Sequence, residues 1–156
     1  MSKPSLKGTS GFKQGKYTPI NPDKYIGKVT DIVFRSSWEQ KFMYYLDMNR
    51  GVIRWNSEDV VIPYFWEVDG KMHKYYMDFY FEAMNSKGEL IKYIIEIKPK
   101  KDTEVTKPKR LTEKAKARYA NNILTVSKNE AKWKAAEEFA KQKGLVFKIL
   151  TEDDLF

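Results

Sequence analysis

The chain has 156 residues, 42% hydrophobic and 15% aromatic, a composition typical of one folded domain with a sizeable core. It has no Cys and a single histidine, which excludes disulfides and thiolate metal sites and argues against zinc. The formal net charge of +8 favours a polyanionic partner, most often nucleic acid, although solubility alone also explains a basic surface.

The first 26 residues are rich in Gly, Ser and Pro and show no periodicity. They hold five lysines and one acid. We therefore predict a flexible basic arm over residues 1–26, which docks near Tyr17 to Tyr25, and a single domain over residues 27–156. The arm has no apolar signal core, and no stretch approaches the ~20 apolar residues of a membrane span. The expected protein is intracellular and does not bind a membrane.

A helix is predicted to begin at Ser36 and to run to about Met48. Ser36 and Glu39 have the spacing of a capping box. Four apolar residues recur at the spacing of one helical face: Trp38, Phe42, Tyr45 and Leu46. Glu39 has two interpretations that its position leaves open: a helix cap, or an acid that reaches a metal ion through water.

Three strands are predicted next, over residues 60–64, 74–81 and 91–98. Turns at 68–71 and 85–88 join them. The aromatic residues of the second strand more often pack a sheet than stack on bases. His73 near its start is interpreted as a surface strand residue, with a phosphate contact as the alternative.

The hairpin of the last two strands brings two acids together. Asp78 and Glu96 each lie nine residues from Lys87, so a hairpin centred there places them opposite each other. Directly opposed residues share a face, with Cβ atoms ~4.5–5.5 Å apart. Lys98 shares that face with Glu96, because residues two apart in a strand point the same way.

Two carboxylates this close repel unless a cation lies between them, a geometry that suits Mg²⁺. Asp78 and Glu96 are thus predicted metal ligands, with the backbone carbonyl of Ile97 as a third. Lys98 would hold the attacking water and stabilise charge on a phosphate, the parts that metal-assisted phosphodiester hydrolysis needs. The alternative is an edge hairpin whose charged residues are solvated cross-strand pairs.

A polar loop follows, and we predict that its basic residues contact the DNA backbone, although a solvated loop gives the same pattern. These residues are Lys100, Lys101, Lys107, Lys109 and Arg110. Helices are then predicted over 112–121 and from a second capping box at Ser127, ending at Gly144. A strand over 146–150 and a final turn over 151–154 complete a βαβ crossover.

The set Glu39, Met77-Asp78 and Glu96-Ile97-Lys98 resembles the PD-(D/E)xK nuclease superfamily, with Met77 in place of the usual Pro. The amino-acid sequences of segments 15–25, 35–39, 76–80 and 96–100 are similar to those of one branch of the superfamily, the head-completion nucleases of T-even-like tailed phages. The similarity runs from about Gly15 to Leu150. Transposase nuclease subunits share the core but not the arm.

This resemblance implies a restriction-endonuclease-like α/β fold, with a central mixed sheet flanked by helices. It implies a Mg²⁺-dependent endonuclease on double-stranded DNA, with Mn²⁺ as a substitute, and raises Glu39 to a third active-site acid. Arg35, Ser36, Lys100 and Lys101 become candidate DNA contacts. It places the protein in the host cytoplasm during phage assembly, or in the virion, with head or portal proteins as candidate partners.

Other functions remain open alongside a catalytic endonuclease. One is a structural head-completion or DNA-end-binding protein that keeps the fold without cutting; another is a junction-resolving nuclease, which would require a dimer. The paired acids with Lys98 favour the enzyme, because a module that only binds a polyanion has no need of clustered carboxylates. No Gly-rich phosphate loop is present, so no nucleotide cofactor is expected.

Overall fold

The computed structural model describes residues 14–155. Three short 3₁₀ turns, at Pro22–Lys24, Val29–Asp31 and Lys100–Asp102, accompany the regular elements. In chain order these elements are β1 (Gly15–Lys16), β2 (Val33–Phe34), α1 (Ser37–Met48), β3 (Val52–Ser57), β4 (Val61–Trp66), β5 (Lys71–Tyr76), β6 (Phe79–Met84), β7 (Leu90–Ile97), α2 (Glu113–Lys143), β8 (Val146–Leu150) and α3 (Glu152–Leu155).

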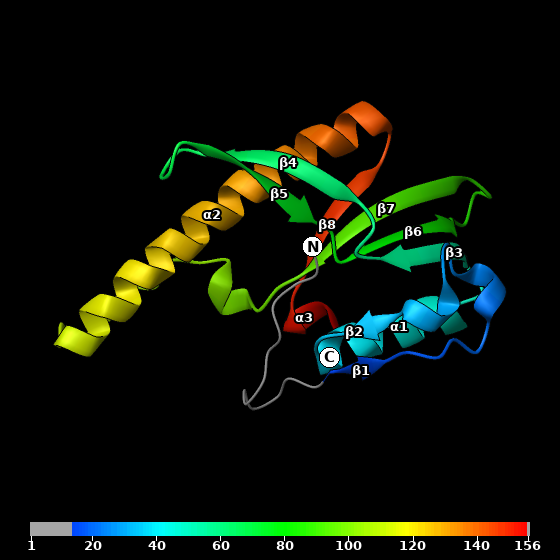
Figure 1. The fold of residues 1–156 in the computed structure, drawn as a ribbon, viewed down its shortest axis with the longest axis horizontal. Coiled ribbons are helices and arrows are strands. Elements are labelled where there is room, and N and C mark those ends of the chain that lie inside the picture. The colour runs from blue at the N-terminus through cyan, green and yellow to red at the C-terminus, as the bar shows by residue number, and fades with distance from the viewer. Residues whose placement is uncertain (1–13, 156) are drawn as a thin grey trace.

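The central sheet has the strand order β3-β6-β7-β8 (Figure 1). Its strands are antiparallel except for β7 and β8, which are parallel and joined through α2. A parallel pair needs such a crossover connection. The mixed sheet flanked by helices and the βαβ crossover are therefore confirmed, whereas β3 was missed because its sequence does not alternate clearly between apolar and polar residues.

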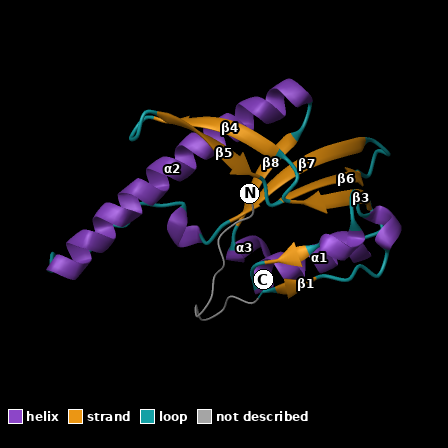
Figure 2. Cartoon of the chain, in the orientation of Figure 1, coloured by secondary structure: helices purple, strands orange, loops and turns teal. Residues whose placement is uncertain are grey.

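Each face of the sheet is covered by a different layer (Figure 2). On one face Ile95 and Ile97 pack with residues of α1 such as Phe42 and Leu46. On the other face Ile94 packs with the β4–β5 hairpin and with the carboxyl-terminal half of α2. Alternate residues of β7 thus enter two separate cores, and the second core lies on the face to which Glu96 belongs.

Helix α1 begins as predicted at the cap Ser36, whose Oγ accepts a hydrogen bond from the backbone N–H of Glu39 at 3.1 Å. Phe42 and Leu46 of the predicted apolar face are buried. Tyr45 is 51% exposed, so that part of the prediction is wrong, and Met43 packs into the core instead.

The strand predicted over residues 74–81 is wrong as a single element. The chain leaves the two-stranded β4–β5 sheet after Tyr76 and enters the central sheet at Phe79. Between them the N–H of Met77 still bonds the carbonyl of Val60, at 2.9 Å. Asp78 therefore occupies the connection between two sheets, and β5 crosses the face of the sheet that β6 belongs to.

The two helices predicted after the basic loop form one continuous helix, α2, of 31 residues. Thr112 caps its start, and Gly144 ends it at φ 71°, where glycine is favoured because it lacks a Cβ. The predicted second start at Ser127 is wrong, since its hydroxyl accepts a hydrogen bond from Trp66 at 3.2 Å instead. Among residues 14–155 no helix is long and apolar enough to cross a membrane.

Residues 14–26 of the predicted arm are held on α1 by the buried Asp47. Its carboxylate accepts hydrogen bonds from the Tyr17 hydroxyl at 2.6 Å and from the backbone N–H groups of Ile20 and Asn21 at 2.7 and 2.9 Å. Burial raises the pKa of Asp47, but these bonds outweigh it and lower that pKa. Docking near Tyr17 to Tyr25 is thus confirmed and flexibility of residues 14–26 is not; the rest of the arm, residues 1–13, lies outside the described residues.

Candidate active site

Asp78 and Glu96 face each other where the β6–β7 ladder ends. The ladder pairs Phe79 with Ile95, so the next position of the same register places Asp78 opposite Glu96, as predicted. The backbone N–H of Ile97 donates to Oδ2 of Asp78 at 2.7 Å, which ties that carboxylate to β7. Both acids are buried, at 2% and 5% exposure, so this end of the sheet holds two carboxylates at facing positions that are largely shielded from water.

Glu96 has two further partners from different elements. The hydroxyl of Tyr75, on β5, donates to Oε2 at 2.5 Å, and Nζ of Lys98 lies 3.8 Å from Oε1. Burial and then the charge of Glu96 raise the pKa of Tyr75, so this hydroxyl keeps its proton and remains a donor. Tyr75 was predicted only as a packing residue; its hydrogen bond was missed because β5 pairs with β4 and not with β7.

The backbone of Asp78 is fixed by Glu58, which sequence reasoning also missed. The N–H of Glu58 donates to the carbonyl of Asp78 at 3.1 Å. Glu58 has φ 55°, a left-handed conformation uncommon for residues with a Cβ. Its carboxylate accepts a hydrogen bond from Nε of Arg35 at 3.2 Å, which links the site to the start of α1. Such strained residues cluster at functional sites.

Glu39 lies in the first turn of α1 and is buried. Its Oε1 accepts a hydrogen bond from the N–H of Arg35 at 3.3 Å, one residue before the position that a capping box uses. Within residues 14–155, no three Asp, Glu or His side chains gather closely enough to hold a metal ion. Glu39 thus bonds the backbone just before the helix cap, and its role as a third catalytic acid stays a prediction.

The residues predicted to contact DNA have different surroundings. Ser36 is buried as a helix cap, and Arg35 is largely covered by its pair with Glu58. Lys100 pairs with Asp153 of α3 at 3.3 Å; this bond and the charge of Asp153 raise the pKa of Lys100. The other four, Lys101, Lys107, Lys109 and Arg110, are exposed.

His73 is a strand residue, as expected, and its Nε2 lies 2.7 Å from Oδ2 of Asp69 in the turn of the β4–β5 hairpin. Its ring stacks on Tyr64 with a centroid separation of 5.2 Å. These partners explain His73 through the structure of the hairpin. A phosphate contact is not needed to account for it.

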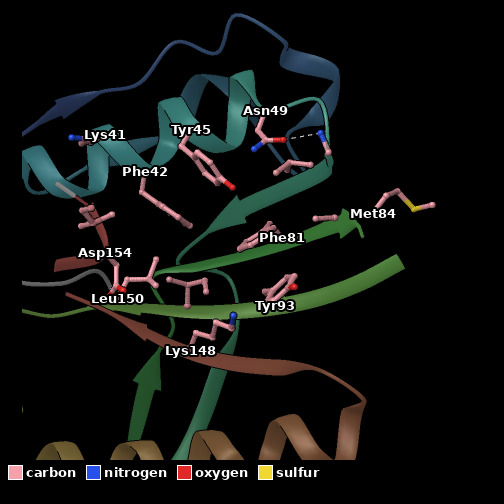
Figure 3. A pocket seen from close by; sticks show the side chains of 15 residues that line it. Lys41, Phe42, Tyr45, Asn49, Phe81, Met84, Tyr93, Lys148, Leu150 and Asp154 are labelled. Carbon is pink, nitrogen blue, oxygen red and sulfur yellow. Dashed lines mark hydrogen bonds between the residues drawn. The ribbon is translucent and has the colours of Figure 1, made fainter. Parts of the chain in front are cut away.

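An open hollow lies between α1, α3 and the sheet (Figure 3). Phe42 and Tyr45 line it from α1, and Phe81 and Tyr93 from the sheet. Because Phe81 and Tyr93 pair one step away from the Tyr80–Ile94 pair, they lie on the face of the sheet opposite Glu96. The hollow is therefore separate from the paired acids.

Comparison with known proteins identifies the family. Residues 49–152, which include both paired acids and Lys98, match the family model described as TnsA-like endonuclease N terminal. The chain belongs to this endonuclease family. It is also 46% identical over 142 residues to the head completion nuclease of Enterobacteria phage T4. The aligned region covers 90% of this chain and 92% of that protein.

The endonuclease family is of the PD-(D/E)xK type, so the resemblance drawn from the sequence is confirmed and the chain is a phosphodiester hydrolase by homology. The family match starts at residue 49, after α1, whereas the phage relative covers nearly the whole chain.

Endonucleases of this type are typically metal-dependent. The donors at the site fit a hard divalent cation, because Asp78 and Glu96 supply buried carboxylate oxygens at facing positions and no soft ligand lies with them.

Proposed function

We propose that this chain is a Mg²⁺-dependent endonuclease that hydrolyses phosphodiester bonds of double-stranded DNA during completion of a phage head. The observation that carries the proposal is the pair of buried carboxylates, Asp78 and Glu96, with Lys98 beside it. Two acids at facing positions just beyond the ladder repel each other, so their placement there needs a chemical reason. A cation held between them provides that reason.

In this proposal Asp78, Glu96 and the carbonyl of Ile97 hold the metal ion. When bound, the ion supplies a Lewis acid and lowers the pKa of a nearby water. The hydrogen bond from Ile97 N–H to Asp78 and that from Tyr75 to Glu96 fix both carboxylates before any ligand arrives. Such pre-set geometry avoids reorganisation during the reaction.

Lys98 would orient the attacking water and stabilise the charge that develops on the phosphate. Its ammonium is 3.8 Å from Glu96, longer than a direct hydrogen bond, and its side chain is 24% exposed. The lysine is therefore both close to the acids and accessible to a substrate. Glu39 is proposed as an additional acid that acts through water from the start of α1.

The exposed residues Lys101, Lys107, Lys109 and Arg110 are proposed as phosphate contacts, together with Lys100, Arg35 and Ser36 near the site. The setting proposed is the host cytoplasm during assembly or the virion itself, with head or portal proteins as partners. The name of the phage relative supports this setting. Mn²⁺ is proposed to replace Mg²⁺, because both take octahedral oxygen ligands.

The test incubates the purified protein with linear and with supercoiled DNA, in parallel with Mg²⁺, Mn²⁺, Ca²⁺ or EDTA. We expect linearisation of the supercoiled substrate with Mg²⁺ and Mn²⁺ and none with EDTA. Cutting that persists in EDTA would overturn the metal-dependent mechanism. Binding of DNA ends without cutting under any metal would support a structural head-completion protein instead.

A further inference from the structure

The amino-terminal half of α2 extends beyond the sheet (Figure 1). The segment from Pro99 to Lys132, which contains this half and the loop before it, holds ten Lys or Arg residues and four acids. The loop is fastened to one side of the helix, because Asn122 and Asn129 donate hydrogen bonds to the carbonyls of Glu104 and Asp102 at 3.1 and 2.9 Å. The helix and its loop are thus one strongly basic unit.

One stripe along this half of the helix is mostly basic. Its residues follow one another at intervals of four or three, the spacing of one helical face. They are Lys114, Arg118, Asn121, Thr125, Lys128 and Lys132. The first four are exposed, whereas the side next to them, with Ala115 and Val126, is buried.

The stripe ends beside the paired acids. Nζ of Lys132 lies 5.3 Å from the ring centroid of Tyr75, whose hydroxyl donates to Glu96. One turn earlier, Nζ of Lys128 lies 5.1 Å from the ring centroid of Trp66 on β4. These contacts place the carboxyl-terminal end of the stripe against the β4–β5 hairpin. From Lys132 it leads along α2, past the β4–β5 hairpin, to Lys114.

We propose that this stripe binds the phosphate backbone of duplex DNA and guides it to the paired acids. The proposal rests on the proposed nuclease function and adds the surface along which the substrate lies. Its partner follows from charge: four cations and two polar residues on one face attract a regular polyanion. The span from Lys114 to Lys132 is about 27 Å at 1.5 Å per residue, the length of roughly eight base pairs.

The experiment removes two charges from the stripe and two from the opposite side of the same helix. Lys114→Ala with Arg118→Ala alters two exposed stripe residues, and alanine favours the helix. The matched control, Lys116→Ala with Lys134→Ala, alters exposed lysines about 160° around the helix from Lys114. Thermal unfolding checks that both double variants fold like the wild type.

Affinity is measured in Ca²⁺ against salt concentration, with a duplex of about 24 base pairs and a single strand of equal length. We expect the stripe variant to bind the duplex roughly tenfold or more weakly, with a salt slope smaller by about 1.8, the value for two lost phosphate contacts. The control variant should stay close to the wild type. Equal weakening by both variants, no weakening by either, or an equal loss on the single strand would each overturn the proposal.

A separate cleavage assay distinguishes the two proposals. If the wild type cuts plasmid DNA and the stripe and control variants bind alike, only the stripe is wrong. If the wild type never cuts but the stripe variant alone loses affinity, the stripe stands as a DNA surface and the nuclease function is what fails.

Discussion

Two buried glutamates on the same face of the sheet have similar partners. Glu96 on β7 accepts a hydrogen bond from Tyr75 at 2.5 Å, and Glu82 on β6 accepts one from Tyr80 at 2.6 Å. Each also has a cation nearby, Lys98 at 3.8 Å from Glu96 and Arg54 at 3.1 Å from Glu82. Their burial is nearly equal, 5% and 7%.

The two differ in what lies across the ladder. Glu82 faces Lys92 in the register of the two strands and forms an ion pair with Arg54, so the groups across the ladders from it are cations. Glu96 faces Asp78, and the cation beside it lies beyond hydrogen-bonding distance. Burial of an acid thus does not identify a metal site; a second acid at the facing position is what distinguishes Glu96 from Glu82.

The largest expected difference is in cleavage. Asp78→Asn and Glu96→Gln should each lower the Mg²⁺-dependent rate by about a hundredfold or more, because each removes a ligand of the ion that stabilises the transition state. Glu82→Gln, an equally buried acid with the same type of partner, should cut close to the wild-type rate. Plasmid nicking measured over time with the three variants checks this, and full activity of Asp78→Asn would refute the assignment.

The second-largest difference is expected between Lys98 and Arg54, the cations beside the two glutamates. Lys98→Ala should lose most of its turnover, roughly a hundredfold, while it still binds the metal ion, because the lysine acts on the phosphate and not on the carboxylates. Arg54→Ala should change turnover little, since Arg54 balances Glu82. Calorimetry and cleavage on the same samples decide it. Unchanged turnover of Lys98→Ala would make that residue a structural ion pair.

A smaller effect is expected from the two tyrosines. Tyr75→Phe should lower turnover about tenfold, a loss typical when a residue that orients a metal ligand is changed. It should also raise the Mn²⁺ concentration needed for half-maximal activity, a change that lost packing alone would not produce. Tyr80→Phe removes a matching hydrogen bond from Glu82 and serves as the control. Equal effects of both changes would assign Tyr75 to stability only.

The smallest expected effect is on the free energy of unfolding without metal. Substitutions at the two sites should change it in opposite directions. Asp78→Asn should raise the free energy of unfolding by up to about 1 kcal/mol, because it relieves repulsion between opposed acids. Glu82→Gln should lower it by about 1 kcal/mol, because a charged partner of Arg54 is lost. Urea unfolding in EDTA measures both. A loss of stability in Asp78→Asn would mean that Lys98 already balances the pair.

The register of the paired acids was predictable because a two-residue period and a turn centre fix it. The break between β5 and β6 was not, since it depends on the bond from Met77 to Val60, a residue 17 positions earlier that directly precedes β4. Ser127 was misread as a helix cap for the same reason: its partner is Trp66, 61 residues away. Contacts between distant segments leave no local pattern to read.

The residues around the two acids also could not be predicted from local sequence patterns. Tyr75 reaches Glu96 because the β4–β5 hairpin crosses the sheet, and nothing in the spacing of these residues indicates that crossing. Glu58 gives no signal either, since a left-handed residue is expected to be Gly or Asn and not Glu. The paired acids and Lys98 could be predicted from strand periodicity, whereas the residues that hold them in place could be identified only from the fold.

Binding of Mn²⁺ followed by calorimetry tests most directly whether Asp78 and Glu96 form the metal site. The wild type and Glu82→Gln should bind the ion alike, whereas Asp78→Asn and Glu96→Gln should bind it at least about tenfold more weakly, with all four proteins folded. Equal affinity of Asp78→Asn and the wild type would contradict the account, because the ion would then be held elsewhere on the protein.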